Sequence, residues 1–156
     1  MTRDNLAFIS FKPDNQRFIP FVSIDQFLSG RRDSELTLKE AADIYRHAID
    51  VMRLLVIEIQ DYRMQHKPLP AEIVWELGNS IFVLTDELKE LSLQIDGVYD
   101  HLVRDLGVKR KWLEKVIILR RYLPRKNLIP NSLNWGQCEK GTRRKAERIA
   151  KGLPIM

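Results

Sequence analysis

The segment PAEIVWELGNSIFVLTDELKEL, residues 70–91, decides the fold that the sequence predicts. Its apolar residues recur at alternating spacings of three and four, which places them along one stripe of an α-helix. Pro70 suits the first turn, because a backbone N–H at that position has no partner within the helix. The predicted stripe comprises Val74, Leu77, Ile81, Leu84, Leu88, Leu91 and Ile95.

A first long helix is predicted from about residue 37 to residue 66. Thr37-Leu38-Lys39-Glu40 fits a capping box, in which Thr37 and Glu40 satisfy free backbone N–H groups at a helix start. The short connection at residues 67–70 makes the two helices antiparallel neighbours. Their seams form a hairpin core, and either seam also suits dimerisation. The stripe of the first helix is Ala41, Tyr45, Ala48, Met52, Leu55, Ile59 and Tyr62.

The two ends of the chain differ from this helical middle. Residues 6–11 and 17–24 are rich in aromatic and β-branched residues around the turn sequence KPDNQ, which predicts a β-hairpin. Beyond Gly97 we expect helices at about 98–106, 109–123 and 142–151. The predicted fold class is therefore mainly α, a helical bundle. It divides into a β-hairpin arm with a linker (1–34), an antiparallel helical hairpin (35–97) and a basic helix-turn-helix-like module (98–156).

Charge is unevenly distributed along the chain. Residues 1–103 carry 11 Lys and Arg against 17 Asp and Glu, whereas residues 104–156 carry 15 against 4. A phosphate backbone attracts a basic segment of this kind. The polarity indicates an acidic scaffold with a basic end that binds nucleic acid. A solvated basic tail is one alternative. Binding to an anionic membrane is a weaker one, because the tail is not clearly amphipathic.

Residues 99–122 match the pattern of a helix-turn-helix. Such a unit needs a glycine or a similar residue at its tight turn, where φ is positive, and apolar residues on both sides. Gly107 fits the turn, although Val103 stands where a smaller residue is usual. An ordinary helical hairpin with a glycine turn is the alternative. The apolar positions are filled by Leu102, Leu106, Val108, Leu113 and Val116.

The second helix of this unit carries basic side chains. Arg110 and Lys111 lie at its start, where Arg and Lys donate to guanine O6 and N7 in the major groove. Other cations are expected to hold phosphates, which positions the protein without reading sequence. They are Lys109, Lys115, Arg120, Arg121, Arg125 and Lys126, followed by Arg143, Arg144, Lys145, Arg148 and Lys151 in the last helix.

Trp135 lies in a segment, residues 127–141, that is rich in Asn, Pro and Gly. An exposed tryptophan there would stack on an unpaired base, which would favour RNA or single strands. A buried tryptophan would instead cover the core.

A series of short motifs begins at residue 75: WELG (75–78), YDHLVRDL (99–106), RKWL (110–113), RYLP (121–124) and LNW (133–135). In this order they resemble the helical amino-terminal region of a family of PD-(D/E)XK nucleases. That region is regarded as DNA-binding, so the resemblance implies DNA binding in a mobile-element or defence-related assembly. Pro13-Asp14 and Glu87-Leu88-Lys89 imitate the nuclease signature. However, Glu87 and Lys89 fall within a predicted helix and not on neighbouring strands around a metal.

No catalytic site, metal site or cofactor is predicted. Asp86, Glu87 and Glu90 lie at helical spacing, as do His101 and Asp105, but no second ligand cluster accompanies them. The single cysteine, Cys138, and three scattered histidines argue against zinc. No apolar run approaches the roughly 20 residues of a membrane span, and the charged start is unlike a signal peptide, so we expect a cytoplasmic protein.

Together these features predict a non-enzymatic DNA-binding protein, a small regulator or the DNA-contacting subunit of a larger assembly. An RNA- or ribonucleoprotein-binding adaptor is one alternative, and it would prefer structured RNA to duplex DNA. A helical protein-interaction module is the other. It would bind a second copy or another protein through the hairpin, without nucleic acid.

Overall fold

The computed structural model describes residues 8–14, 17–22, 34–91, 94–96 and 98–155, and the side chains of 8–14, 17–22, 34–38 and 94–96 are not described. The described part is mainly helical, as predicted. The chain divides into two compact units, residues 1–50 with 83–107 and residues 51–82 with 108–156. Helices α2 (Ser34–Met64) and α3 (Ala71–Glu90) each contribute to both units.

These units differ from the predicted segments 1–34, 35–97 and 98–156. The segments came from local composition, which treats a long helix as one object. In the structure each long helix is divided near its middle, at residues 50 and 83. The helical hairpin therefore supplies part of the core of each unit.

The first unit combines the start of α2 and the end of α3 with three strands and helix α4 (Val98–Leu106). Strand β1 (Phe8–Asp14) pairs antiparallel with β2 (Arg17–Val22) and parallel with β3 (Gln94–Asp96). Their side chains lie outside the described residues, so the packing of the predicted hairpin stays a prediction. The capping box predicted at Thr37 is misplaced, because α2 already begins at Ser34 and Thr37 lies within the helix. Gly97, predicted to end the second helix, is outside the described residues.

The predicted second helix is too long. It ends at Glu90, and Ile95, the last residue of its stripe, lies in β3 opposite Ile9 of β1. The reason is that an apolar residue at the next helical spacing looks the same in sequence whether the helix continues or a short strand follows. The first five positions of the stripe are correct, since Val74, Leu77, Ile81, Leu84 and Leu88 are fully buried, whereas Leu91 follows the helix and is half-buried.

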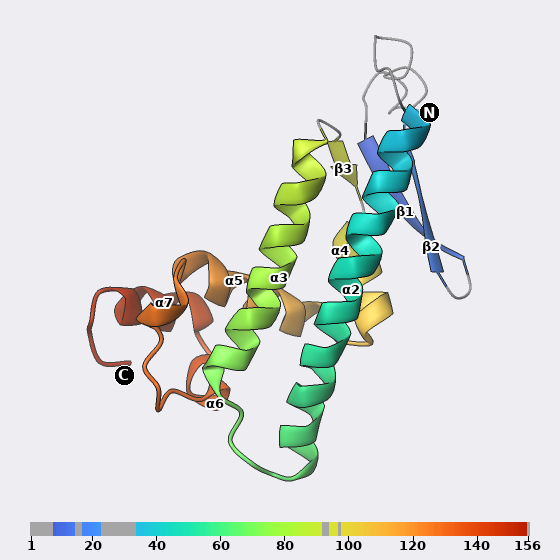
Figure 1. Cartoon of the computed structure of the whole chain (residues 1–156). Coiled ribbons are helices and arrows are strands. Elements are labelled where there is room, and N and C mark those ends of the chain that lie inside the picture. The colour runs from blue at the N-terminus through green and yellow to red at the C-terminus, as the bar shows by residue number, and fades with distance from the viewer. Residues whose placement is uncertain (1–7, 15–16, 23–33, 92–93, 97, 156) are drawn as a thin grey trace. The chain divides into compact units, whose positions relative to one another are not determined.

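In the second unit the last half of α2 and the first half of α3 run in opposite directions (Figure 1). The turn begins at His66, whose φ of 54° is positive. The Lys67 N–H donates to the Tyr62 carbonyl oxygen at 3.0 Å and the His66 N–H to that of Arg63 at 3.1 Å. These two bonds form a Schellman motif that satisfies the free carbonyl groups at the helix end.

The buried stripe of α2 differs in part from the predicted one. Ala41, Tyr45, Met52 and Ile59 are buried as predicted, whereas Ala48, Leu55 and Tyr62 are only half-buried. Ile49 and Val56 take the remaining core positions. Two apolar stripes adjoin on this helix, and spacing alone does not distinguish the one that faces the core.

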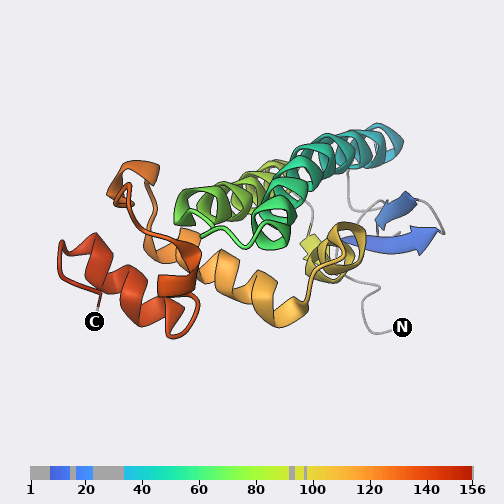
Figure 2. The same cartoon turned by 90° about the horizontal axis from the view of Figure 1, so that it is seen from below.

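The rest of the second unit contains α5 (Arg110–Tyr122), the 3₁₀ turn η1 (Lys126–Leu128), α6 (Trp135–Cys138) and α7 (Thr142–Ala150). Helices α5 and α7 pack against each other (Figure 2). Helix α3 approaches α5 closely at Gly78. A Cβ on Gly78 would lie 2.8 Å from both the Val116 carbonyl oxygen and the Arg120 Cβ. Only glycine permits this approach.

Helix α6 falls in the segment that the sequence predicted to be a loop. Asn134 and Gln137 form a capping box, each side chain bonding the other's backbone N–H at 3.0 Å. The same segment joins the start of α3, because the Trp135 N–H donates to the Leu69 carbonyl oxygen at 2.7 Å. The Asn-x-x-Gln pattern was the local signal that would have revealed this helix start.

Candidate nucleic-acid interface

Positive charge is concentrated in the second unit. The first unit carries 9 Lys and Arg against 14 Asp and Glu, a net charge of −5, and the second carries 17 against 7, a net charge of +10. Every cation of the predicted interface belongs to the second unit. These side chains therefore belong to one compact unit, and they differ in the contacts that each makes within it.

The elements of the predicted helix-turn-helix are present, but they belong to different units. Helix α4 is part of the first unit and α5 part of the second. Gly107, between them, has the predicted positive φ, 65°. The predicted apolar positions Leu102, Leu106, Leu113 and Val116 are buried, and Val108 is half-buried. Burial of this kind also fits an ordinary helical hairpin, so the helix-turn-helix stays a prediction.

The start of α5 is basic and has no side-chain cap. Lys109 is the N-cap residue and its side chain bonds no backbone N–H, while Arg110 and Lys111 follow without an acidic residue in the first turn. Basic side chains at a helix N-terminus oppose the helix dipole, and an anion there is favoured. Arg110 lies 3.6 Å from Glu114, and both side chains are mostly exposed. Such a surface pair is weak, so Arg110 can exchange it for a phosphate.

Arg120 holds the fold and does not face outward. Its Nε donates to the Asn79 side-chain oxygen at 2.9 Å. Its guanidinium carbon lies 4.6 Å from the centre of the Phe82 ring and 5.5 Å from that of Trp75. Cation–π contacts of this kind are stronger where water is excluded. Arg120 was predicted to bind phosphate, and this position instead joins α5 to α3.

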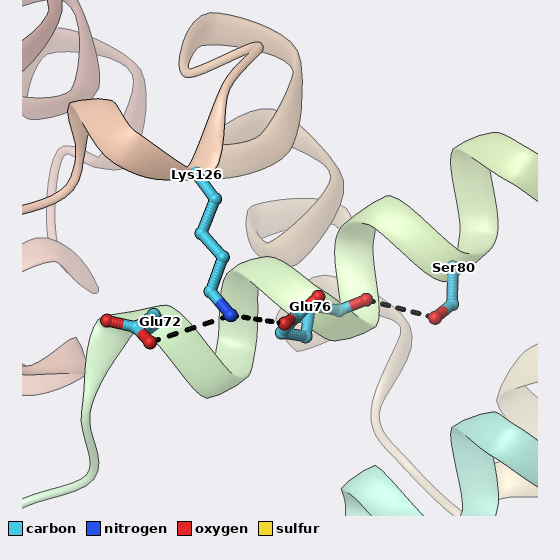
Figure 3. Close-up of polar contacts among 4 residues, drawn as sticks. All are labelled: Glu72, Glu76, Ser80 and Lys126. Carbon is cyan, nitrogen blue, oxygen red and sulfur yellow. Dashed lines mark hydrogen bonds and ion pairs between the residues drawn. The ribbon is translucent and has the colours of Figure 1, made fainter.

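Lys126 is neutralised by two carboxylates of α3 (Figure 3). Its Nζ lies 2.6 Å from a Glu76 carboxylate oxygen and 3.6 Å from one of Glu72. The hydrogen bond to Glu76, together with the charges of both glutamates, raises the pKa of the Lys126 ammonium above its usual value. The Ser80 hydroxyl donates to the Glu76 backbone oxygen at 3.0 Å and adds a bond within α3. A phosphate would have to displace the glutamates to bind Lys126.

The cations of α7 also differ among themselves. The Arg143 guanidinium lies over the Tyr122 ring of α5, 5.1 Å from its centre, and 3.9 Å from Glu147. Arg148 donates to the backbone oxygen of Pro154 and so holds the chain that follows the helix. Arg144 is exposed and Lys145 half-buried.

Apart from Lys151, which is exposed at the C-cap of α7, the predicted cations fall into two groups. The first group, which we call the engaged cations, contacts other side chains or the backbone. It consists of Arg110, Arg120, Lys126, Arg143 and Arg148. The second group makes no ion pair with any described residue, and we call it the open cations: Lys109, Lys111, Lys115, Arg121, Arg125, Arg144 and Lys145. Lys140 is also exposed and was missed, because the prediction gave weight to helices and Lys140 lies between two of them.

The aromatic residues of the second unit are covered. Each of the six is buried or half-buried: Tyr62, Trp75, Phe82, Trp112, Tyr122 and Trp135. Trp135 is only 3% exposed and its ring meets that of Trp112 edge to face, with 6.4 Å between ring centres. The Arg63 guanidinium lies over Trp112. Of the two predicted roles for Trp135, the structure supports the cover over the core and contradicts base stacking.

Other chemistry has little support among the described residues. They contain no group of three or more His, Cys, Asp and Glu arranged to hold a metal ion. Burial raises the pKa of the Cys138 thiol to about 11, which keeps it protonated and poorly nucleophilic. No helix in the described ranges has the length and apolar character needed to cross a membrane.

Comparison of the chain with protein-family models, with curated proteins and with solved structures found no match. The resemblance to the helical region of nucleases is therefore a sequence observation alone.

Proposed function

We propose that the protein binds the phosphate backbone of duplex DNA through the open cations of its second unit. The observation that carries the proposal is the number of these cations and their lack of carboxylate partners. Seven cations without a carboxylate partner lie on or beside α5 and α7, two helices in contact with each other, in a unit of net charge +10. Unpaired cations at this density repel one another, and phosphates relieve that repulsion while releasing counterions.

Duplex DNA is preferred over single strands because the aromatic side chains are covered. Proteins that bind single strands stack bases on exposed rings. Here Tyr122 lies beneath Arg143, Trp112 beneath Arg63, and Trp135 is buried. What remains exposed on α5 and α7 is mainly charge, which suits a backbone of phosphates.

Within this function α5 is the candidate helix for the major groove, with Arg110 and Lys111 at its start. The resemblance of the motifs between residues 75 and 135 to a DNA-binding region supports DNA over RNA. The protein would then act without catalysis, as a small regulator or as the DNA-contacting subunit of a larger assembly.

The test is binding of the purified protein to labelled duplex DNA, single-stranded DNA and structured RNA of equal length across a salt series. Each phosphate contact contributes about −0.9 to the slope of log affinity against log salt, so seven contacts give a slope as steep as about −6. Duplex DNA should bind tightest. No binding at moderate salt would refute the function, and a clear preference for structured RNA would replace DNA by RNA.

Two lysines of the second unit provide a matched pair of variants. Lys111 has no carboxylate partner among the described residues, whereas Lys126 is held by Glu72 and Glu76. Lys111→Ala should reduce the salt slope by about 0.9, and Lys126→Ala should change it less, because the native ammonium is already neutralised. Equal losses in both variants would contradict the division into open and engaged cations.

Arg110→Ala separates groove contacts from backbone contacts. If Arg110 reads a base, its loss relaxes sequence preference, whereas Lys145→Ala weakens binding to all duplexes alike. Identical behaviour of the two variants would remove α5 from the major groove and leave backbone contacts only.

A further inference from the structure

The second unit has an exposed seam on α2 that the basic surface does not use. Leu54, Ile57, Asp61 and Met64 repeat at spacings of three, four and three, and we call them the α2 seam. This is the pattern by which one helix of a coiled coil meets another. The core residues Met52, Val56 and Ile59 each lie one or two positions before a seam residue. The seam therefore faces a different side of the helix from these core residues.

The seam is unusually exposed for apolar residues. Leu54 is 69% exposed, Ile57 54% and Met64 78%, and the neighbouring Val51 is 43% exposed. Single exposed apolar residues are common, but a row of them at coiled-coil spacing marks an interaction site. From Val51 to Met64 the row extends for roughly 20 Å along the helix, because each residue adds about 1.5 Å. A second helix has the right shape to cover it.

Charge determines which helix fits. Asp61 lies within the seam and Glu58 beside it, and neither forms an ion pair with a described residue. The two cations nearest to the seam along the chain already have contacts, because Arg63 lies over Trp112 and Arg53 interacts with another residue. An occupant that covers Leu54 and Ile57 also removes water from these carboxylates, and a carboxylate in an interface must be paired.

A second copy of the chain does not satisfy this requirement. A parallel copy in register would place Asp61 beside its own counterpart, and an antiparallel copy would place it against apolar residues of the other seam. An anionic membrane surface would be repelled by both carboxylates. A helix with apolar residues along one face and Lys or Arg beside them satisfies both the shape and the charge.

We infer that the α2 seam binds a basic amphipathic helix of a partner protein, with a Lys or Arg of that helix paired to Asp61. This inference does not depend on nucleic-acid binding, because the seam and the open cations are separate side chains. The protein would then join a basic helical partner to whatever its cationic surface holds.

The test uses two labelled amphipathic peptides that carry Leu along one face and either Lys or Glu on the remaining positions, with binding measured by fluorescence anisotropy. We expect the Lys peptide to bind the wild-type chain and Leu54→Asp to weaken it by about tenfold or more. Val83→Asp is the matched control, because Val83 is an exposed apolar residue of α3 outside the seam, 48% exposed. It should leave the affinity unchanged. The Glu peptide is attracted to the open cations, so its binding should not depend on Leu54.

Two variants of Asp61 make the test decisive. Asp61→Lys should weaken the Lys peptide and create Leu54-dependent binding of the Glu peptide. Asp61→Leu removes the obstacle to self-pairing, so sedimentation should show dimers of that variant. All the substituted positions are exposed, and circular dichroism checks that each variant folds. Binding of the Lys peptide that ignores both Leu54 and Asp61 would overturn the inference. So would self-association of the wild type, or vesicle binding, that Leu54→Asp abolishes.

Discussion

The two compact units use charge in opposite ways. The first, with net charge −5, buries polar groups: the Tyr45 hydroxyl, on a side chain only 1% exposed, donates to an Asp105 carboxylate oxygen at 2.5 Å, and His101 is buried nearby in sequence. The second, with net charge +10, places the exposed residues Arg63 and Arg143 over aromatic rings. Asp105 of the first unit is therefore stabilised by a hydrogen bond, and these two arginines of the second unit by aromatic rings.

A count of basic residues therefore overstates a binding surface. Arg120 would add to any such count, yet it holds α5 against α3 through Asn79 and Phe82. Lys126 is balanced by Glu72 and Glu76. The open cations are the ones that remain available to a ligand. The following variants test the stability of each unit.

The largest effect is expected where α3 meets α5 in the second unit. Gly78→Ala places a Cβ at 2.8 Å from the Val116 carbonyl oxygen, a backbone atom that cannot move without shifting the helix. Overpacking of this kind costs about 2 kcal/mol. The free energy of unfolding from urea titration should fall by that amount.

Gly136→Ala is the matched control for this prediction. A Cβ there would meet only the Asn134 side-chain oxygen, at 3.4 Å, so stability should change little. Similar losses in the two variants would mean that the second unit does not depend on a close approach of its helices.

A smaller gain in stability is expected at the turn after α2. His66 adopts a positive φ of 54°, which strains a residue with a Cβ. His66→Gly should therefore stabilise the protein by up to about 1 kcal/mol, measured as a rise in the urea midpoint. Gln65→Gly, at the preceding position with no positive φ, should instead destabilise it. A loss in both variants would show that the His66 side chain contributes more than its backbone strain costs.

The smallest effect concerns pH and the first unit. Burial lowers the pKa of His101 below 6.5, with Asp105 opposing the shift in part. The unfolded chain then binds a proton more readily than the folded one. Stability should fall as pH drops below about 6.5, and this loss is complete below the lowered pKa.

His101→Gln removes this titration, so its unfolding free energy should vary less with pH between 7 and about 5 than that of the wild type. His47→Gln, at an exposed position of α2 in the same unit, is the matched control. A pH dependence that persists in His101→Gln would assign the effect to other groups.

Sequence patterns predicted most of the helices and failed at the end of α3. Val74, Leu77 and Ile81 lie in the core as predicted, and α4, α5 and α7 begin and end within two residues of the expected positions. The stripe failed at Ile95, where a strand replaces the helix, because the competing partner, β1, is distant in sequence. Long-range pairing of this kind has no local signature.

The candidate interface was predicted as a set of residues but not as a geometry. The sequence places Arg120 and Lys126 in the same basic run as Lys111 and Arg121. No local feature of the sequence shows that α3 places Asn79 beside Arg120. The same is true of Glu72 and Glu76, which α3 places beside Lys126. Which cations are engaged depends on tertiary contacts, whereas the charge itself is a property of composition.

The positions of the tryptophans make tryptophan fluorescence a probe of the second unit. All three, Trp75, Trp112 and Trp135, belong to that unit, and Trp75 and Trp135 are shielded from water. Their emission will therefore shift to longer wavelength when the second unit opens and will not respond directly to the first. Unfolding curves from tryptophan emission and from far-ultraviolet circular dichroism will coincide if the two units unfold as one and separate if they do not.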